Sequence, residues 1–145
     1  MLNRKKPQMK ILIGNLDDLF TEILSEIIRD AIKRKHDVTV ISSSYSDELQ
    51  QIAEENEIDI FILVLNNIIY HSKLSFQKRM ENSLHLINHF KMTYKKPVIA
   101  LSGWNEDSSY ITRAKLSADF FFPIPFETDA FGKAIRKCLD LKEAE

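Results

Sequence analysis

The chain has 145 residues, of which 44% are hydrophobic and 28% charged, and its formal net charge at pH 7 is -1. This length and composition suit a single globular domain, and the near-zero charge argues against a nucleic-acid-binding or membrane-binding protein. One cysteine excludes an internal disulfide, and three glycines leave no G-x-x-x-x-G-K or G-x-G-x-x-G phosphate loop. We expect a cytoplasmic protein, because the first nine residues are polar and basic and no apolar run approaches the ~20 residues of a membrane helix.

Five short apolar segments predict buried strands. They cover residues 10–14, 37–42, 60–65, 97–102 and 119–123. The third is the most informative, because six apolar residues run without a break between Asp59 and Asn66. Such a strand has no face for water, which is typical of a parallel sheet covered by helices on both sides.

Apolar residues at helical spacing predict five helices between and after these strands. The helices cover residues 19–35, 46–57, 76–92, 107 or 108 to 117, and 126–139. In the first, we expect the apolar residues from Phe20 to Ile32, Ile23 included, to pack on the sheet. Ser46 is expected to cap the second helix. In the third, a stripe from Met80 to Phe90 should face inward, leaving His85 and His89 in solvent.

Alternating strands and helices predict an α/β protein with a parallel five-stranded sheet between two helical layers. For five strands in this length we expect a flavodoxin-like (βα)5 three-layer sandwich of strand order 2-1-3-4-5. The domain is expected to span residues 10–142, after a short polar tail over residues 1–9, with no output domain. In such sheets a functional site lies beyond the carboxyl ends of the strands.

Several segments resemble the receiver domain of response regulators. Residues 10–20 (KILIGNLDDLF) resemble its first strand and acidic turn, residues 59–66 its third strand, and residues 97–102 (PVIALS) its fourth. The most specific match is residues 117–126 (SADFFFPIPF), which resemble the family pattern G-A-D-D-F-L-P-K-P-F. The resemblance implies phosphorelay signalling, in which an aspartate ending the third strand accepts a phosphoryl group beside bound Mg²⁺.

This sequence departs from the family at nearly every position of the phosphorylation pocket. By the resemblance, the two metal-binding acids become Asn15 and Leu16, the phosphoacceptor becomes Val64, and the lysine of the fifth strand becomes Ile124. Ser102 alone keeps the family's chemistry. A shifted alignment would place Asn66 at the acceptor position, but an amide accepts no phosphoryl group. We therefore expect no metal, no cofactor and no catalytic residue.

The charged positions of the pocket have been replaced together. An acid, an acid and a base have become Leu16, Val64 and Ile124, so no single charge is left buried without its counterpart. We expect these three side chains to contact one another as an apolar plug. Asp17 lies beside them, but it and Asp18 are too few ligands to hold Mg²⁺ well.

Aromatic side chains gather near the fourth and fifth strands. Phe120, Phe121 and Phe122 must alternate between the two faces of their strand, so they can be core residues or an aromatic edge for a partner. Trp104 can seal the altered pocket or mark a binding surface. By resemblance to receivers, a partner-binding face would combine residues 109–115, Tyr110 included, with residues 120–122 and 131–139. The basic segment 70–79 can be a solvated or a docking loop.

Two functions of different kinds follow. The first is a stand-alone receiver that takes no phosphoryl group and acts by contact with a signalling partner, or with a second copy of the chain. The second is a small-ligand sensor or enzyme that uses the strand-end cleft, with Asn15, Asp17, Asp18, Asn66, Asn67 and Ser102 as its polar groups. Nucleic-acid binding through Arg4, Lys5, Lys6 and the basic loop is disfavoured by the net charge.

Overall fold

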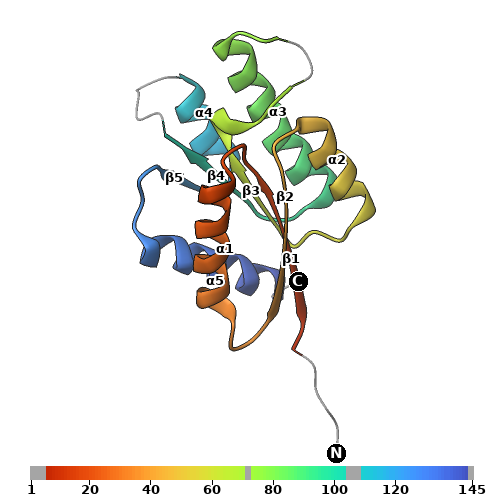
Figure 1. The fold of residues 1–145 in the computed structure, drawn as a ribbon, viewed down its shortest axis with the longest axis vertical. Helices are drawn as coiled ribbons and strands as arrows, with labels where there is room; N and C mark the ends of the chain where they lie inside the picture. The colour runs from red at the N-terminus through yellow and green to blue at the C-terminus, as the bar shows by residue number, and fades with distance from the viewer. Residues whose placement is uncertain (1–5, 71–72, 104–108, 144–145) are drawn as a thin grey trace, which may run out of the picture.

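The computed structural model describes residues 6–70, 73–103 and 109–143, with the side chains of the last three left out. The strands are β1 (Gln8–Gly14), β2 (Asp37–Ser43), β3 (Ile60–Val64), β4 (Val98–Ser102) and β5 (Phe120–Pro123). The helices are α1 (Asp18–Ile32), α2 (Ser46–Glu55), α3 (Phe76–Tyr94), α4 (Ser109–Ser117) and α5 (Thr128–Glu143), and a short 3-10 helix, η1 (Leu65–Asn67), follows β3. The strands form one parallel sheet of order β2-β1-β3-β4-β5, which confirms the predicted fold class (Figure 1).

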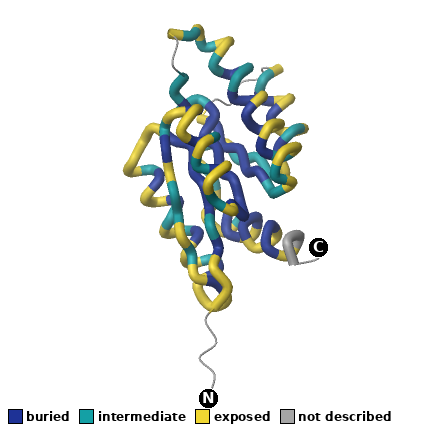
Figure 2. Tube along the Cα trace, turned by 90° about the vertical axis from the view of Figure 1, so that its right-hand side faces the viewer, coloured by how far each residue is buried: buried dark blue, intermediate teal, exposed yellow. Residues whose placement is uncertain are grey.

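The sheet separates two apolar cores. Alternate residues of β3 point to opposite faces, so Phe61 and Leu63 join the core beneath α2, α3 and α4, while Ile60, Ile62 and Val64 join the core beneath α1 and α5. Every residue of β3 and β4 is buried, and the dark-blue strands at the centre of Figure 2 lie between partly exposed helices. The unbroken apolar run therefore has the cause predicted from the sequence, which is cover on both faces.

Two aspartates fix the strands at the amino edge of the sheet. Asp59, just before β3, accepts a hydrogen bond from the backbone N–H of Lys10 at 2.8 Å and donates its own N–H to the Lys10 carbonyl at 2.8 Å. Asp119, just before β5, repeats the arrangement with Val98, at 2.8 Å and 2.9 Å. We call these two pairs the aspartate clasps. Each clasp ties the start of one strand to the neighbouring strand and so fixes their register.

Three local predictions were wrong. Helix α1 ends at Ile32, so Lys33, Arg34 and Lys35 lie in the turn after it. Ser46 is the first residue of α2, and the capping position belongs to Tyr45, which makes no side-chain cap bond. Ile23 is 48% exposed rather than packed on the sheet. The inward place on α1 is taken by Thr21, whose hydroxyl receives a hydrogen bond from the Asn15 amide at 2.9 Å.

Helix α3 follows the sequence prediction closely. Its inward stripe of Met80, Leu84, Ile87 and Phe90 is buried, and His85 and His89 are exposed. Ser75 caps the helix by accepting a hydrogen bond from the Lys78 N–H at 3.2 Å. Within the part of the chain that the structure describes, no helix is long and apolar enough to cross a membrane.

Candidate functional site

The candidate site lies where four strands end together, toward the top of Figure 1. Asn15 follows β1, Asn66 lies in η1 after β3, Ser102 ends β4, and Ile124 follows β5. Because parallel neighbouring strands end at the same edge of a sheet, the predicted site residues of these strands come from one edge. Trp104 lies outside the described residues.

Asn15 is the centre of a closed hydrogen-bond network. It is 3% exposed, and its amide nitrogen donates to the Thr21 hydroxyl at 2.9 Å and to the Asp17 carbonyl at 2.8 Å. Its amide oxygen accepts from the Asn67 side chain at 2.8 Å and from the Asp17 N–H at 3.3 Å. A carboxylate could not donate to Thr21 or to the carbonyl. The amide thus has a structural role at a position where the resemblance places a metal ligand.

Asp17 also has a structural role. It is the N-cap of α1, and its side chain accepts a hydrogen bond from the Phe20 N–H at 3.1 Å. An N-cap carboxylate satisfies a free amide of the first turn and interacts favourably with the positive end of the helix dipole. A carboxylate in this position serves the helix without any metal.

An apolar side chain, Val64, lies at the position where the resemblance places the phosphoacceptor. Val64 is 2% exposed and belongs to the core beneath α1 and α5, against which Ile124 also packs. Both side chains line a surface groove with a volume of about 460 Å³. The rest of the described lining is Asp17, Leu19, Phe20, Ile23, Asn66, Asn67 and Gly103.

Leu16 does not take part, so the prediction of a three-residue plug was wrong at this position. Its side chain is 55% exposed and is not among the residues that line the groove. Leu16 comes two residues after the last paired residue of β1, between the fixed Asn15 and the N-cap Asp17. The chain turns there, and the side chain points into solvent. The pocket is consequently an open apolar groove rather than a filled one.

The groove has few groups that could carry chemistry. Asp17 is the single carboxylate among its described lining residues, and none of them is a lysine, arginine or histidine. Ser102 is fully buried at the end of β4, and its carbonyl accepts the Ile124 N–H at 2.9 Å. Across the described residues, no group of three or more histidine, cysteine or acidic side chains could hold a metal ion.

The aromatic residues of β5 pack against the two cores and remain partly exposed. Phe121 packs with Tyr110 against the core beneath α2, α3 and α4, while Phe120 and Phe122 pack against the opposite core. All four are half-buried. The Lys115 ammonium lies 5.6 Å from the centre of the Phe121 ring, in a cation–π contact that helps to cover this edge strand.

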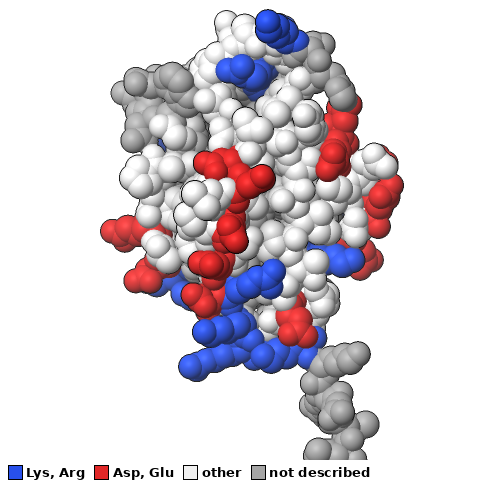
Figure 3. Space-filling view, viewed as in Figure 1, with Lys and Arg blue, Asp and Glu red and all other residues white. Residues whose placement is uncertain are grey.

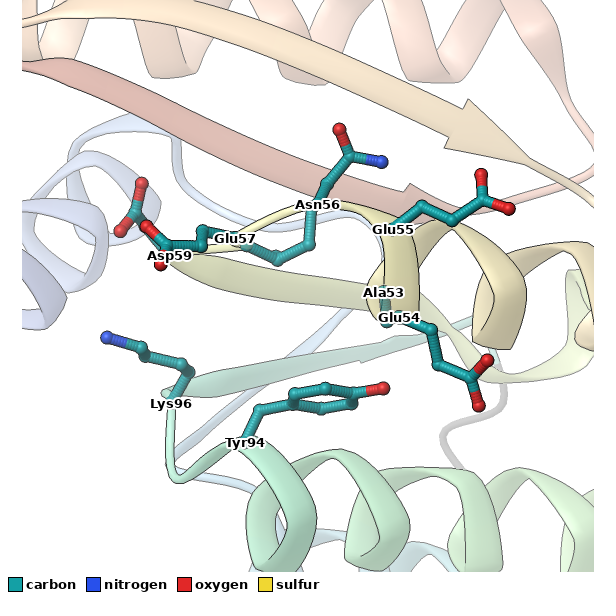
Figure 4. Close-up of a pocket in the computed structure, with 9 residues that line it drawn as sticks. Ala53, Glu54, Glu55, Asn56, Glu57, Asp59, Tyr94 and Lys96 are labelled. Carbon is teal, nitrogen blue, oxygen red and sulfur yellow. The ribbon is translucent and has the colours of Figure 1, made fainter.

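A second cavity, of about 460 Å³, lies at the opposite edge of the sheet and was not predicted from the sequence. Glu54, Glu55, Glu57 and Asp59 line it with Tyr94 and Lys96. Figure 4 shows the carboxylates spread along the connection from α2 to β3 rather than converging on one point. Burial, and to a smaller degree Glu54, raise the pKa of the Tyr94 phenol. No single ligand position follows from this arrangement.

Comparison with known proteins supports the fold and goes no further. No protein-family model matches the chain, and no curated protein sequence matches it. Among solved structures, a response regulator from Thermotoga maritima is 17% identical, with 94% of this chain and 99% of that chain covered and a TM-score of 0.65. The response regulatory domain of mrkE from Klebsiella pneumoniae is 15% identical, covering 94% and 100%, with a TM-score of 0.71. A receiver domain from Clostridium thermocellum is 20% identical, covering 94% and 98%, with a TM-score of 0.70.

These structures match the chain over nearly its whole length and nearly theirs. The strand order and the alternating helices described above agree with that likeness. At such low identity the likeness concerns the backbone and not the residues of the site. The chain therefore has the fold of a response-regulator receiver domain.

Proposed function

We propose that this protein is an atypical, non-phosphorylatable receiver domain that acts by protein–protein contact in two-component, or phosphorelay, signal transduction. The observation that carries the proposal is the burial of Val64 at the end of β3, where the resemblance places the phosphoacceptor. Valine has no atom that can accept a phosphoryl group, and no carboxylate occurs between Ile60 and Glu81. Without chemistry at the site, information can leave the domain only through a binding surface.

For that binding surface we propose the face formed by α4, β5 and α5, as the resemblance to receivers suggests. Leu116, on α4, is 80% exposed, and the neighbouring Lys115 lies over Phe121. A large apolar side chain beside an aromatic cluster and a charged rim has the composition of a small protein interface. The occupant would be a signalling protein or a second copy of the chain.

The first experiment tests whether the site takes a phosphoryl group. The protein is incubated with acetyl phosphate and Mg²⁺ beside an ordinary receiver domain as positive control, and intact masses are compared. We expect the control to gain one phosphoryl group and this chain to gain none. A mass increase that mild hydroxylamine removes would reveal an acyl phosphate and overturn the proposal.

The second experiment tests the face. Proteins captured from the source cell by the parent are compared with those captured by a Lys115→Glu/Leu116→Ser variant and by Met92→Ser, a control at an exposed position on α3. We expect the first variant alone to lose the partner, and light scattering reports whether the partner is a second copy. Equal capture by all three proteins would refute the choice of face.

A small-ligand sensor or enzyme that uses the groove is the second candidate. One observation favours it, which is that the groove is open and has a volume of about 460 Å³. Against it, the Asn15 and Asn67 amides bind each other, and Asp17 caps a helix. This leaves few polar groups to orient a substrate, so we prefer the interaction domain.

A further inference from the structure

The turn after α1 and the outer part of α5 enclose a third cavity, with a volume of about 470 Å³. The turn leads directly into β2, so this cavity lies at the amino edge of the sheet, opposite to the groove. The charged residues of its described lining are four cations and two acids: Lys33, Arg34, Lys35, Arg136, Asp30 and Asp140. Four positive charges against two negative ones leave an excess of two positive charges.

This positive charge is local. The whole chain has a formal net charge of -1, but Figure 3 shows a blue group of lysines and arginines at the lower end of the molecule, below a red column of acids over α1. The near-neutral total is therefore the sum of regions of opposite sign. Such a region attracts anions over a short range even when the whole protein does not.

The end of helix α1 does not need all of these cations. Basic side chains near the carboxyl end of a helix commonly bond to its free carbonyl groups. Here the Ile32 carbonyl accepts the backbone N–H groups of Lys35 and His36, each at 3.0 Å. The side chains of Arg34 and Lys35 have no hydrogen-bond or ion-pair partner among the described residues. Adjacent like charges also repel each other, so folding alone does not account for them.

Arg136 has donors that the fold does not use. Its guanidinium group carries five N–H donors, and among the described residues it makes one bond, to the Ala31 carbonyl at 3.5 Å. The guanidinium groups of Arg136 and Arg34 both belong to side chains that line the cavity. A planar guanidinium fork matches two oxygens of a phosphate group, which makes arginine a preferred residue for binding phosphate.

The cavity also has an apolar part. Ile32 and Leu139 line it, and both belong to the core beneath α1 and α5, with exposed fractions of 4% and 5%. Sites for small molecules typically combine an apolar surface with a few polar groups that fix the orientation of the ligand. A ligand that carries an apolar body beside its charged group would cover these two side chains.

We infer that this cavity binds a phosphate monoester with an apolar body. Arg34, Lys35 and Arg136 hold the phosphate group, and the apolar body lies against Ile32 and Leu139. A phosphate monoester carries a charge of about -1.5 to -2 at pH 7, which matches the excess of two positive charges, whereas a carboxylate carries only one charge. Soluble metabolites and lipid headgroups both carry this group. The inference goes beyond the proposed function, because it involves neither phosphoryl transfer nor a protein partner.

The neighbouring charges favour a compact ligand over an extended polyanion. A nucleic acid that entered the cavity would continue along α1, where Asp18, Glu22 and Glu26 follow one another at four-residue spacing. These carboxylates would repel its further phosphates. A single phosphate group stays within the reach of the cations that line the cavity.

The probe for a soluble ligand is phenyl phosphate, compared with benzoate, which has the same ring and a carboxylate. Backbone amide NMR spectra of the full chain follow each titration in phosphate-free buffer with about 0.15 M salt, at which charges more than about 8 Å apart are largely screened. We expect amides of residues 30–36 and 136–140 to shift, and phenyl phosphate to bind at least about tenfold more tightly than benzoate. Inorganic phosphate should shift the same amides and bind more weakly than phenyl phosphate, because it has no ring.

Two variants that lose the same charge separate the cavity from the total charge. Arg34→Gln/Lys35→Gln should weaken phenyl phosphate about five- to tenfold. Lys133→Gln/Lys137→Gln, at exposed positions of α5 outside the lining of the cavity, is the matched control and should bind as the parent does. Asp140→Asn should strengthen binding about two- to threefold, because it removes a like charge from the lining. All five positions are exposed, and circular dichroism verifies that the variants are folded.

Vesicles test a lipid headgroup as the source of the phosphate. The full chain is sedimented with vesicles of phosphatidylcholine alone, with added phosphatidic acid, or with added phosphatidylglycerol. Phosphatidic acid carries a monoester, whereas phosphatidylglycerol carries a diester with one negative charge. Sedimentation with phosphatidic acid that Arg34→Gln/Lys35→Gln abolishes would assign the site to a lipid headgroup. Binding of phenyl phosphate without sedimentation would assign it to a soluble ligand, and both results support the inference.

Absence of both phenyl phosphate binding and sedimentation with phosphatidic acid would overturn the inference. Equal loss of binding in Lys133→Gln/Lys137→Gln would show attraction to the total charge and overturn it as well. Unchanged or weaker binding by Asp140→Asn would place the anion outside this cavity, with the same consequence. None of these results bears on the phosphorylation assay or on the capture of a partner, so the inference and the proposed function stand or fall separately.

Discussion

Returning an acid to the end of β3 tests the altered pocket directly. Val64 is 2% exposed, and in Val64→Asp the new carboxyl group would face Ile124 and the core beneath α1 and α5. No lysine or arginine occurs among the described residues that line the groove, and the single carboxylate among them, Asp17, would repel an ionised neighbour. The substitution therefore removes buried hydrocarbon and adds a polar group with few partners.

The magnitude follows from these two terms. Loss of the buried valine surface costs about 1.5 kcal/mol, and an incompletely paired buried polar group adds about 1–3 kcal/mol. Because the groove opens to water on one side, the carboxyl group retains some hydration. We expect the free energy of unfolding at neutral pH to fall by about 2–4 kcal/mol.

The loss should depend on pH in a defined direction. Burial raises the pKa of the new carboxyl group in the folded state above the value of about 3.9 in the unfolded chain. Between these two values the unfolded chain is ionised while the folded protein still holds the proton, so stability falls as pH rises. Val64→Asp should be closest to the parent near pH 4 and furthest from it near pH 7.

Val64→Asn is the matched control, because asparagine has the shape of aspartate without its charge. Denaturant unfolding of the parent and both variants at several pH values separates the loss of packing, common to both, from the ionisation, which only the aspartate has. A Val64→Asp protein as stable as the parent at pH 7 would mean that the strand end is already wet and polar. The reasoning from a buried apolar acceptor position would then be refuted.

Three further outcomes are expected. A Cβ atom on Gly14 would lie 2.9 Å from Leu49 Cδ1 and 3.0 Å from Leu63 Cδ2, so Gly14→Ala should lower the free energy of unfolding by about 1–3 kcal/mol. Gly103→Ala is the control, because a Cβ atom there meets open space, and denaturant unfolding compares the two variants. Ser83→Ala should lower the free energy of unfolding by about 1–3 kcal/mol, because it leaves the buried Leu65 carbonyl and the Tyr70 hydroxyl without their partner. Ser25→Ala is the control and should cost less, because the Ser25 hydroxyl bonds only within its own helix. Burial raises the pKa of Cys138 from 9.0 to about 12, with a smaller contribution from Asp119, so a disulfide reagent at pH 8 should label it about a thousandfold more slowly than free cysteine until the protein unfolds.

Most of the fold could be predicted because single patterns fixed each element. The unbroken apolar run of β3 permits only a strand covered on both faces, and the stripe from Met80 to Phe90 permits only one inward side for α3. The pattern failed on α1, where Ile23 is apolar but lies beside the open groove at the edge of the sheet. Apolar spacing shows which side of a helix faces the sheet, but it does not show where the sheet ends.

The site was predicted less well, for a related reason. Val64 and Ile124 line the same groove, as their places at the ends of β3 and β5 imply. Leu16 lies in a turn whose direction is set by the hydrogen bonds of Asn15 and Asp17. The partners of Asn15 are Thr21, which lies on α1, and Asn67, which is far away in the sequence. The replacement of three charged residues by three apolar ones suggested that Leu16, Val64 and Ile124 contact one another. The turn after β1 directs Leu16 into solvent, so only Val64 and Ile124 line the same groove.

The aspartate clasps have a consequence for how this scaffold can change. They hold β3 and β5 in register at the amino edge of the sheet, the end away from the groove. Strand alignment is thus secured at a distance from the groove, and residues at the opposite edge can be exchanged without the strands slipping. A protein engineer who wished to install a new binding specificity could vary exposed groove positions such as Leu19 and Ile23 while leaving Asp59 and Asp119 untouched. Replacing either aspartate would be expected to disturb every position downstream in its strand at once.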